Sequence, residues 1–417
     1  MKTKIHFHSD CSFFAGCENM LANFFNSTCF TEKYDVSFSY RTTYRYDAGF
    51  KSRIKNIKIT VFPLVLLDIS SIYNSISKQP KWIQKGLKGL VNLFMIKYIF
   101  VLYNTIILLN VFNKRKIDIL HVNNGGYPGA YSCASAVIAA KLVGINKIVY
   151  VVNNIAVPYK NISRIIDYFL DRIVASNVTF FVTGSKYAGT HLLKVLGVNE
   201  NKVKNIYNGI STRSVTEDRK TVLSRLGLDD RKFYLGIVAI HEVRKGHVYL
   251  FKAIQKLKKI LTKEEMPVLL VEGEGPLTDQ LFKFIKDNSL EKNILFIGNE
   301  KNVFNFMNAI DLIVLPSISN EDFPNVVLEA MSLGKIIIAS KIAGVPEQIE
   351  HMKTGIIVEP QNIDDLAHFI YEIIINRDKY VVLGSNAKQV FNDRFTDDVA
   401  ISNYDLLYNN ELERIYL

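Results

Sequence analysis

Two glutamates in one loop–helix segment are the residues of this chain best suited to chemistry. An apolar run at Leu312–Leu315 predicts a strand, a loop follows at 316–324, and a helical pattern begins near Asn325. Glu321 stands in the loop, and Glu329 stands eight residues later on the expected helix. The first N–H groups of a helix have no internal partner and carry the positive end of the helix dipole, so a phosphate binds there readily. The segment could therefore hold an anionic group beside two carboxylates.

The expected amide donors at this helix start are Asn325, Val326 and Val327. Glu329 lies one turn further along, where its carboxylate can accept two hydrogen bonds from a vicinal diol such as a ribose. Glu321 lies on the loop, where it could reach a sugar. Two glutamates at this spacing are also compatible with two solvated carboxylates, so the interpretation depends on the residues around them.

The ordered motifs around these glutamates resemble the signature of glycosyltransferase family 4. They are Phe323-Pro324, Leu328-Glu329-Ala330-Met331, Gly334-Lys335, Ala343-Gly344-Val345-Pro346-Glu347 and Thr354-Gly355. Upstream, Ile206-Tyr207-Asn208-Gly209-Ile210 is similar to the interdomain hinge of that family. The match is strong over about 180–412 and thin before it. The resemblance implies the GT-B fold and sugar transfer with retention at the anomeric carbon.

The resemblance also implies which residues hold a nucleotide-sugar donor. Lys245 would bind the donor diphosphate, where its charge helps the nucleoside diphosphate to leave, and such electrostatic help is usually a large catalytic term. A basic pair at a helix start otherwise opposes the helix dipole. The loops at 272–276 and at Gly298 are similar to those beside the donor and its base. The expected donor-binding set is Arg244, Lys245, Gly273, Glu274, Gly298, Glu321, Asp322, Phe323, Asn325, Val326 and Glu329.

Two departures from the family pattern lie in the first half of the chain. The family often has Gly-Gly-x-Glu after its first strand, whereas here only Gly16 and Glu18 remain, and these are the expected acceptor-side residues. Asn153 stands where the family commonly has a histidine. An amide can donate a hydrogen bond but cannot carry a proton. We expect Glu321, Lys245 and Asn153 to be the catalytic residues.

A third departure is Ile240, which stands where the family has an arginine, and Arg244 is its candidate substitute. No Asp-x-Asp motif occurs in the chain, so we expect a site without metal, in which Lys245 and helix amides carry that charge. We expect no cofactor beyond the nucleotide-sugar co-substrate, for which a UDP-sugar is favoured.

The cysteines and histidines carry no recognisable metal-binding pattern. The cysteine spacing fits neither a zinc site nor a disulfide framework, so buried or reduced thiols are expected. The histidines are scattered, which favours structural roles. These residues are Cys11, Cys17, Cys29 and Cys133, with His121, His241 and His247.

Short apolar runs alternate with longer helical patterns through most of the chain. Continuous Val/Ile/Leu runs are typical of parallel strands that helices cover on both faces. The expected strands are Lys4–His8, Asp35–Tyr40, Ile57–Pro63, Ile117–Val122, Lys147–Val152, Val178–Thr183, Tyr234–Val238, Val268–Glu272, Ile294–Ile297, Leu312–Leu315, Ile336–Ala339 and Gly355–Val358. Repeated β–α–β order predicts two doubly wound, Rossmann-like α/β domains.

The resemblance implies that the two domains face each other across a cleft, with a C-terminal helix that crosses back to the first domain. The expected domains are 1–210, on the acceptor side, with a helix at about 396–417, and 211–395, which binds the nucleotide sugar. Residues 1–212 hold 26 lysines and arginines against 10 acids, although the whole chain has a net charge of +11. A basic domain can meet a membrane, a phosphorylated substrate or nucleic acid. No nucleic-acid motif is present, so we expect no nucleic-acid partner.

The segment Leu90–Phe112 predicts one apolar helix, long enough to cross a bilayer core. Lys81, Lys85 and Lys88 continue a polar stripe along it, as on a helix that lies on a membrane surface. Three interpretations stay open: a core helix, surface contact through about 81–112, and a true span. The start of the chain lacks the apolar core of a signal peptide, which favours a cytoplasmic protein, peripheral at the inner face of the cell membrane.

These observations favour a retaining glycosyltransferase that moves a sugar from a nucleotide-sugar donor to a glycan or lipid-linked acceptor. Enzymes of this kind commonly build cell-surface polysaccharide. Two alternatives stay open: a nucleotide-sugar epimerase or sugar-phosphate synthase on the same fold, and a binding subunit without catalytic activity.

Overall fold

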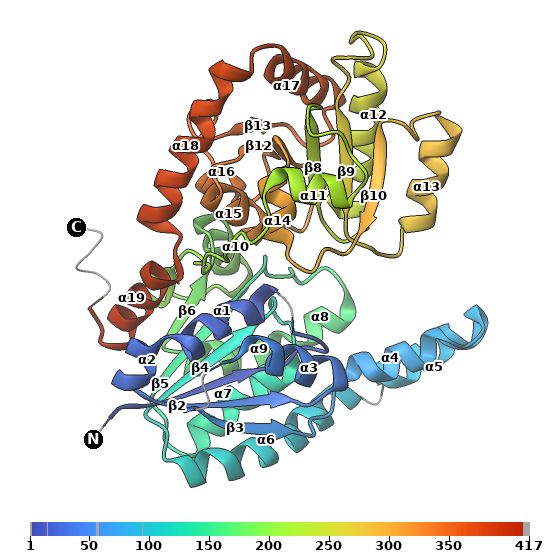
Figure 1. The fold of residues 1–417 in the computed structure, drawn as a ribbon. Helices are drawn as coiled ribbons and strands as arrows, with labels where there is room; N and C mark the ends of the chain where they lie inside the picture. Colours follow the sequence, from blue (N-terminus) through green and yellow to red (C-terminus); the bar gives the residue numbers. More distant parts are fainter. Residues whose placement is uncertain (1, 15, 56–57, 94, 412–417) are drawn as a thin grey trace. The chain divides into compact units, whose positions relative to one another are not determined.

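The computed structural model describes residues 2–14, 16–55, 58–93 and 95–411 of the chain. The chain divides into two compact units (Figure 1): unit 1 is Met1–Ile206 with Ile401–Leu417, and unit 2 is Tyr207–Ala400. The sequence placed the corresponding boundary at 210 and assigned a helix from about 396 to the first domain. The expected strand that begins at Ile57 and the expected last helix at 412–417 extend outside the described residues.

Unit 1 is built on a parallel sheet with the strand order β3-β2-β1-β4-β5-β6-β7. Its strands are β1 Lys4–Ser9, β2 Asp35–Arg41, β3 Thr60–Leu64, β4 Ile119–Asn124, β5 Lys147–Val152, β6 Phe180–Thr183 and β7 Val203–Asn205. The three-residue edge strand β7 was not predicted, because its half-buried Val-Lys-Asn sequence gives no apolar run.

Helices cover both faces of this sheet. The helices of unit 1 are α1 Gly16–Asn26, α2 Thr28–Lys33, α3 Tyr44–Arg53, α4 Ile69–Ser77, α5 Lys81–Leu93, α6 Ile96–Arg115, α7 Tyr131–Leu142, α8 Ile162–Ile166, α9 Tyr168–Asn177 and α10 Lys186–Leu196, with the 3-10 turn η1 Glu200–Lys202. Of these, α4 and α5 extend away from the sheet (Figure 1). α1, α2 and the C-terminal end of α19 (Asp397–Tyr408) pack on the face that carries Ile5 and Phe7. α6, α7, α9 and α10 pack on the opposite face, which carries Leu120 and Tyr150.

The single helix predicted at Leu90–Phe112 is wrong, because the segment forms two helices. α5 ends at Leu93, α6 begins at Ile96, and Met95 between them has a φ of 50°. A left-handed residue cannot continue a right-handed helix. The polar stripe therefore does not run on from α5 into α6, and Phe94 lies outside the described residues.

One side of α6 packs on the sheet and on α7 of unit 1, and the other side is exposed. By length and composition it is the one helix of the described chain that could cross a membrane. However, its Leu108 and Phe112 are buried against the sheet and α7. The Asn104 side chain donates to and accepts from the backbone of Leu67, and Lys97 forms a 2.6 Å ion pair with Asp167. These polar contacts explain the residues that interrupt its apolar sequence.

Unit 2 is built on a second parallel sheet with the strand order β10-β9-β8-β11-β12-β13. Its strands are β8 Tyr234–Val238, β9 Val268–Glu272, β10 Ile294–Gly298, β11 Leu312–Leu315, β12 Ile336–Ser340 and β13 Ile356–Val358. Its helices are α11 Arg219–Arg225, α12 His247–Leu257, α13 Thr278–Asp287, α14 Val303–Ala309, α15 Asn325–Ser332, α16 Val345–Gln348, α17 Ile363–Ile375 and α18 Arg377–Arg394, with the 3-10 turn η2 Val243–Lys245.

The core of unit 2 also has two layers. α12, α13, α17 and the start of α18 bury one face of its sheet, and α11, α14, α15, α16 and the rest of α18 bury the other. The predicted α/β class with two doubly wound parallel sheets is therefore confirmed.

Candidate functional site

The predicted donor residues of unit 2 gather where the strand order of its sheet reverses. β8 is the first strand of this sheet in the sequence, and it pairs with β9 on one side and with β11 on the other. In open α/β sheets, ligands bind in the crevice outside the carboxyl ends of two such strands. The loops that leave β8 and β11 at this point carry Lys245 and Glu321 respectively.

A glycine brings these two loops into contact. Gly246 follows η2 with a φ of 71°, and a Cβ atom there would lie 1.9 Å from the carbonyl oxygen of Pro316. Only glycine permits both this left-handed conformation and such a close approach. The N–H of Ile318 donates to the carbonyl of Arg244 at 2.7 Å, which fixes the β11 loop against η2. The close packing positions Lys245 next to the β11 loop.

Lys245 and Glu321 form an ion pair in this contact. The Nζ of Lys245 lies 2.5 Å from Oε2 of Glu321, and the Oγ of Ser317 donates to the same oxygen at 3.0 Å. Burial lowers the pKa of Lys245, and the neighbouring Glu321 carboxylate opposes this shift. The other oxygen of Glu321, Oε1, has no hydrogen-bond partner among the described residues. A ligand hydroxyl could therefore donate to Oε1.

Arg244 is oriented mainly by a neighbour on its own turn. Its Nε donates to Glu242 at 2.6 Å, and its Nη1 reaches Glu321 at 3.4 Å. Arg244 is less buried than Lys245, with 28% of its side chain exposed against 11%. The arrangement gives one buried cation and one partly exposed cation on the same side of Glu321.

The start of α15 supplies two backbone donors. The N–H groups of Asn325 and Val326 precede the first intrahelical bond, and within the described chain they have no acceptor. The prediction for Val327 is wrong, since its N–H donates to the carbonyl of Pro324 at 3.1 Å. A tightened first turn of this kind commonly satisfies one of the amides at a helix start.

Glu329 lies one turn into α15 as a half-buried carboxylate. Burial raises its pKa to about 7, the charge of Arg213 lowers it, and the charge of Glu272 raises it further. The Glu329 carboxylate has no hydrogen-bond partner among the described residues. Such a group can accept the two hydroxyl donors of a diol.

The predicted loops after β9 and β10 lie side by side. The N–H of Gly273 donates to the carbonyl of Gly298 at 3.0 Å, and the N–H of Glu300 donates to the Glu272 carboxylate at 3.1 Å. Gly273 has a φ of 116°, which places it against the carbonyl of Ala239. The side chain of Glu274 is exposed. These two loops therefore lie at the same carboxyl edge of the sheet as the loops that leave β8 and β11.

Two predicted donor residues have side chains in the interior of unit 2. Asp322 is buried, and its carbonyl accepts from the N–H of Gly344. Phe323 stacks on Tyr207 at 5.2 Å and meets Phe395 edge-on. Any contact of Phe323 with a ligand would therefore have to come from its backbone.

In unit 1, the predicted residues Glu18 and Asn153 are joined by a polar network. The Oγ of Ser9 donates to Glu18 at 3.1 Å, and the amide of Asn123 reaches the same Oγ at 3.3 Å. The amide of Asn153 donates to the Asn123 side chain at 2.8 Å and to the Asn124 carbonyl at 3.0 Å. Glu18 is fully buried, whereas Gly16, which begins α1, is exposed. This network lies at the carboxyl ends of β1 and β4, where the strand order of the first sheet reverses, as it does between β8 and β11 in the second sheet.

The comparisons with known proteins agree with this geometry. Residues 218–390 match the family model described as glycosyl transferases group 1. Residues 218–390, most of unit 2, belong to this family, and the chain is a glycosyltransferase. It is 26% identical to the N-acetyl-alpha-D-glucosaminyl L-malate synthase of Bacillus anthracis over 72% of this chain and 77% of that protein.

A second relative of this glycosyltransferase is the UDP-Gal:alpha-D-GlcNAc-diphosphoundecaprenol alpha-1,3-galactosyltransferase of Escherichia coli. It is 26% identical over 64% of this chain and 68% of that protein. The structure resembles that of HepE from Anabaena in complex with UDP, with a TM-score of 0.74 and 18% identity over 98% of this chain and 100% of that chain. At this identity the likeness shows the GT-B fold alone, and it confirms the predicted fold.

The sequence analysis missed several residues that shape the sites of this glycosyltransferase. Ser317, Arg213 and Gly246 act on the predicted residues of unit 2, and Ser9 and Asn123 act on those of unit 1. Ser9 and Asn123 lie at the carboxyl ends of β1 and β4, and Gly246 and Ser317 follow β8 and β11. This position at the carboxyl edges of the sheets is the signal that could have found these four residues. Arg213 lies between β7 and α11, where no such signal marks it.

His121 has the structural surroundings that were expected, whereas both ring nitrogens of the buried His247 and the Nε2 of His241 have no hydrogen-bond partner among the described residues. Burial lowers the pKa of His241, and it lowers the pKa of His121 and of His247 to about 3. The Nδ1 of His121 contacts the hydroxyl of Tyr408 at 2.5 Å, and the Nδ1 of His241 contacts Thr278 at 2.8 Å. Such histidines stay neutral near pH 7.

All four cysteines are free thiols, in agreement with the expectation of buried or reduced thiols. Cys133 is buried, but Cys29 is exposed, and Cys11 and Cys17 are half-buried neighbours although six residues separate them in sequence. A hydrogen bond with Cys11, burial and the Glu18 charge together raise the pKa of Cys17.

Proposed function

We propose that this glycosyltransferase moves a sugar from a UDP-sugar to a glycan or lipid-linked acceptor, with retention at the anomeric carbon, in the synthesis of cell-surface polysaccharide. The observation that carries the proposal is the Lys245–Glu321 pair beside the start of α15, with Glu329 one turn into that helix. This arrangement offers a cation, two backbone donors and two carboxylates at one sheet edge. The diphosphate, the ribose and the sugar of a nucleotide-sugar each have a chemical counterpart there.

The donor would lie across this edge of unit 2. The N–H groups of Asn325 and Val326 and the Nζ of Lys245 would bind the diphosphate. Glu329 would accept from the ribose hydroxyls, and Oε1 of Glu321 would accept from the sugar. As the bond to the anomeric carbon breaks, negative charge grows on the departing diphosphate, and Lys245 stabilises it without a divalent ion.

The acceptor would meet unit 1 near Gly16 and Glu18, with Asn153 as a hydrogen-bond donor in the polar network. An asparagine cannot relay a proton, so Asn153 would only orient the reacting groups. A lipid-linked acceptor is supported by the Escherichia coli relative, whose name gives a UDP-sugar donor and a diphosphoundecaprenol acceptor.

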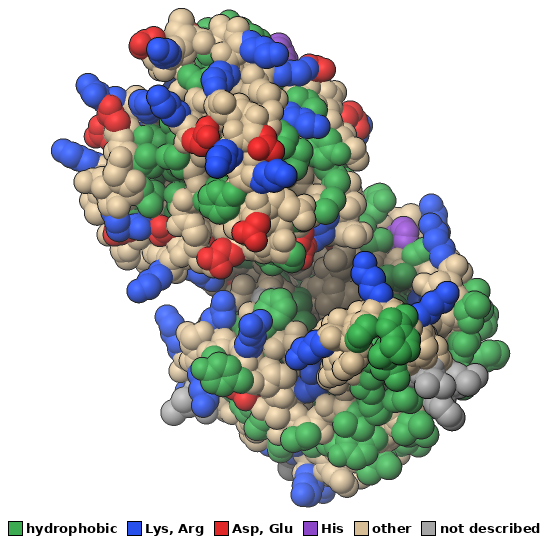
Figure 2. All heavy atoms as spheres, turned by 90° about the vertical axis from the view of Figure 1, so that its right-hand side faces the viewer, with side chains coloured by type: hydrophobic (Ala, Val, Ile, Leu, Met, Phe, Trp, Pro, Cys, Tyr) green, Lys and Arg blue, Asp and Glu red, His purple; other side chains and the backbone are tan. Residues whose placement is uncertain are grey.

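A membrane-facing side of unit 1 is part of the proposal. On α5, Lys81, Lys85 and Lys88 are exposed along one side, and Trp82 is 80% exposed beside them. On α6, Leu102 and Ile106 are 67% and 62% exposed. Figure 2 shows hydrophobic side chains gathered over unit 1, with lysines and arginines around them. Lysines beside apolar side chains suit an anionic lipid surface, which would place the enzyme at the cytoplasmic face of the membrane.

The test is nucleotide binding, followed by product analysis. UDP, GDP, ADP and CMP are each added to the wild type, to Glu329→Ala and to the control Glu264→Ala, an exposed carboxylate of unit 2, without divalent metal. At a hundred times its dissociation constant, a ligand stabilises the folded state by about 2.7 kcal/mol. We expect UDP to raise the Tm of the wild type and of Glu264→Ala, and to have little effect on Glu329→Ala.

Product analysis then tests the reaction. The anomeric configuration of the product, read from its one-bond C–H coupling by NMR, should match that of the donor. An inverted product would contradict retention. A reaction that changes the nucleotide-sugar without any acceptor would instead support an epimerase, and a failure of all four nucleotides to bind would favour a binding subunit.

A further inference from the structure

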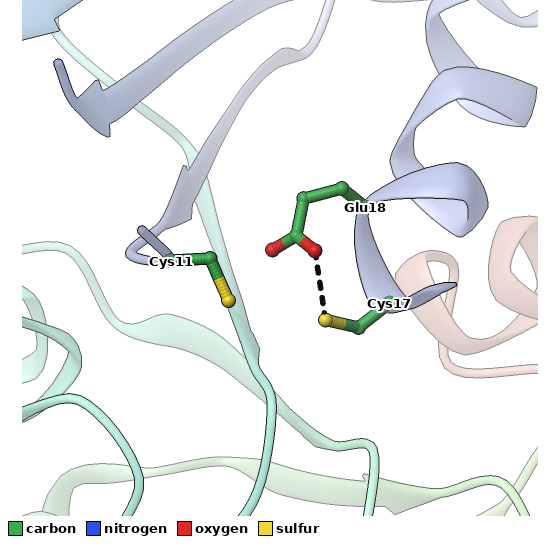
Figure 3. A group of neighbouring side chains, drawn as sticks. All are labelled: Cys11, Cys17 and Glu18. Atoms are coloured by element: carbon green, nitrogen blue, oxygen red, sulfur yellow. Dashed lines mark hydrogen bonds between the residues drawn. The ribbon is translucent and has the colours of Figure 1, made fainter. Parts of the chain in front are cut away.

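Two thiols and a carboxylate come together at the end of β1. Cys11 follows that strand, and Cys17 and Glu18 lie in the first turn of α1. One ligand atom from each residue, the two Sγ atoms and a carboxylate oxygen, all lie within 4.8 Å of one another. Figure 3 shows Cys11 pointing from the strand end toward Glu18 and Cys17, whose Sγ contacts Oε2 of Glu18 at 2.9 Å.

These separations suit a single small cation. Zinc binds sulfur at about 2.3 Å and carboxylate oxygen at about 2.0–2.2 Å, so two sulfur ligands of one tetrahedral ion lie about 3.7 Å apart. Small rotations of the side chains would bring the three atoms to such distances. Thiolates select zinc and similar soft cations, whereas magnesium and calcium prefer oxygen ligands. Three protein ligands leave a fourth position for water.

Hydrogen bonds from neighbouring residues orient Glu18 and Cys17. The Oγ of Ser9 donates to Oε1 of Glu18 at 3.1 Å, and the amide of Asn123 reaches the carbonyl of Cys17 at 3.4 Å. Hydrogen bonds of this kind hold ligands in position around a metal. Cys11 and Cys17 are half-buried, so an ion can reach them from solvent.

The neighbouring carboxylate of Asp10 is engaged elsewhere. It forms a 2.5 Å ion pair with Arg41 and accepts from Ser132 at 2.5 Å. The candidate ligand set is therefore the Cys11, Cys17 and Glu18 side chains alone.

We propose that Cys11, Cys17 and Glu18 form a binding site for one thiophilic divalent cation, of which Zn²⁺ is the natural example. The bound ion fastens the first turn of α1 to the end of β1 and so fixes Gly16 and Glu18. The inference rests on the geometry of unit 1 and does not depend on the proposed function. It also differs from the sequence analysis, which expected no metal, because a spacing of six residues gave no zinc pattern.

The experiment is a titration of the full chain with Co²⁺ under a phosphine reductant, after treatment with a chelator. We expect one equivalent to bind with a near-ultraviolet thiolate-to-cobalt charge-transfer band, which one equivalent of Zn²⁺ abolishes. Cys11→Ser and Cys17→Ser should each weaken binding by at least tenfold. Cys29→Ser, which removes an exposed thiol outside the cluster, should bind like the wild type.

A second measurement needs no variant that could misfold. Wild-type protein is treated with iodoacetamide in the presence and absence of Zn²⁺, and each cysteine-containing peptide is quantified by mass spectrometry. We expect Zn²⁺ to slow alkylation of Cys11 and Cys17 but not of Cys29. The proposal is overturned if the wild type gives no thiolate-to-cobalt band, if the band survives Cys17→Ser, or if Zn²⁺ protects all thiols equally.

Discussion

The Nζ of Lys245 lies 2.5 Å from Oε2 of Glu321, although 76 positions separate the two residues. This pair neutralises a buried cation in the absence of a donor. In the proposed function, a bound diphosphate would pair with Lys245 in place of Glu321, and Glu321 would then be available to the sugar. The two residues should therefore act as one unit, and their substitutions should not be additive.

We expect Lys245→Ala to lower kcat/KM by about 10²–10³-fold, the effect of removing one preorganised electrostatic contact to a transition state. Glu321→Gln should also lower kcat/KM, and the double variant should lose less than the product of the two single losses. Steady-state sugar transfer with a UDP-sugar measures all three. Lys252→Ala, on the exposed side of α12, is the control and should retain wild-type activity. Strict additivity would contradict the coupling.

The affinity for UDP should rise with pH through the pKa of Glu329, which is about 7. In the proposed donor site the ribose hydroxyls would donate to the charged carboxylate, so binding would favour its deprotonated form. The dissociation constant should therefore fall between pH 5.5 and pH 7.5 and then level off. Calorimetric titration of wild type and Glu329→Gln measures it. If Glu329→Gln has the same pH dependence as the wild type, Glu329 does not bind UDP.

Gly246→Ala should destabilise unit 2 more than Gly227→Ala. Both glycines have a φ of 71°, but a Cβ at Gly246 would meet the carbonyl of Pro316 at 1.9 Å, whereas none lies within 4 Å at Gly227. The left-handed conformation alone costs about 1–2 kcal/mol. Thermal unfolding and UDP binding of both variants check this: Gly246→Ala should lose both stability and binding, and Gly227→Ala only a little stability. Equal losses would contradict the close approach.

Acid should destabilise the protein through its buried histidines. Burial lowers the pKa of His8, His121 and His247 to about 3, against about 6.5 in the unfolded chain. The unfolded state therefore binds more protons below pH 6.5. As the pH decreases from there, the free energy of unfolding decreases by about 1.4 kcal/mol per pH unit for each such histidine. We expect the Tm to drop from pH 7.5 to pH 5.5.

The contribution of one histidine to this drop can be measured separately. His121→Gln should make the change in Tm between the two pH values smaller, whereas the exposed His368→Gln should leave it unchanged. If the change in Tm is the same in this variant as in the wild type, His121 has the same pKa in the folded and the unfolded states.

Trp82 reports directly on membrane contact, because it is the single tryptophan of the chain. Vesicles that contain phosphatidylglycerol should shift its fluorescence to the blue, and vesicles of phosphatidylcholine alone should not. The shift should weaken with salt and with the triple substitution of Lys81, Lys85 and Lys88 by glutamate. The matched control, Lys252, Lys259 and Lys263 to glutamate, changes exposed lysines of unit 2. No shift with anionic vesicles would contradict the membrane proposal.

The amino-acid sequence by itself determined the fold class and the main donor segment. β5, β8, β9 and β11 have the predicted ends, and α15 begins at the predicted Asn325. These features are local, because apolar runs set the strands and the β–α–β order sets the parallel pairing. The family resemblance named Lys245, Glu321 and Glu329 from motifs that are contiguous in sequence. Their roles stay predictions that the experiments above test.

Only the tertiary structure decided which side chains meet. The Lys245–Glu321 pair depends on how closely Gly246 approaches Pro316, and no local pattern encodes that distance. The break between α5 and α6 was likewise hidden, because the apolar composition continues while the backbone turns left-handed at Met95. The cluster of Cys11, Cys17 and Glu18 follows from the pairing of a strand end with a helix start. Contacts between loops are set by the packing of whole elements, and the spacing of residues along the chain does not report that packing.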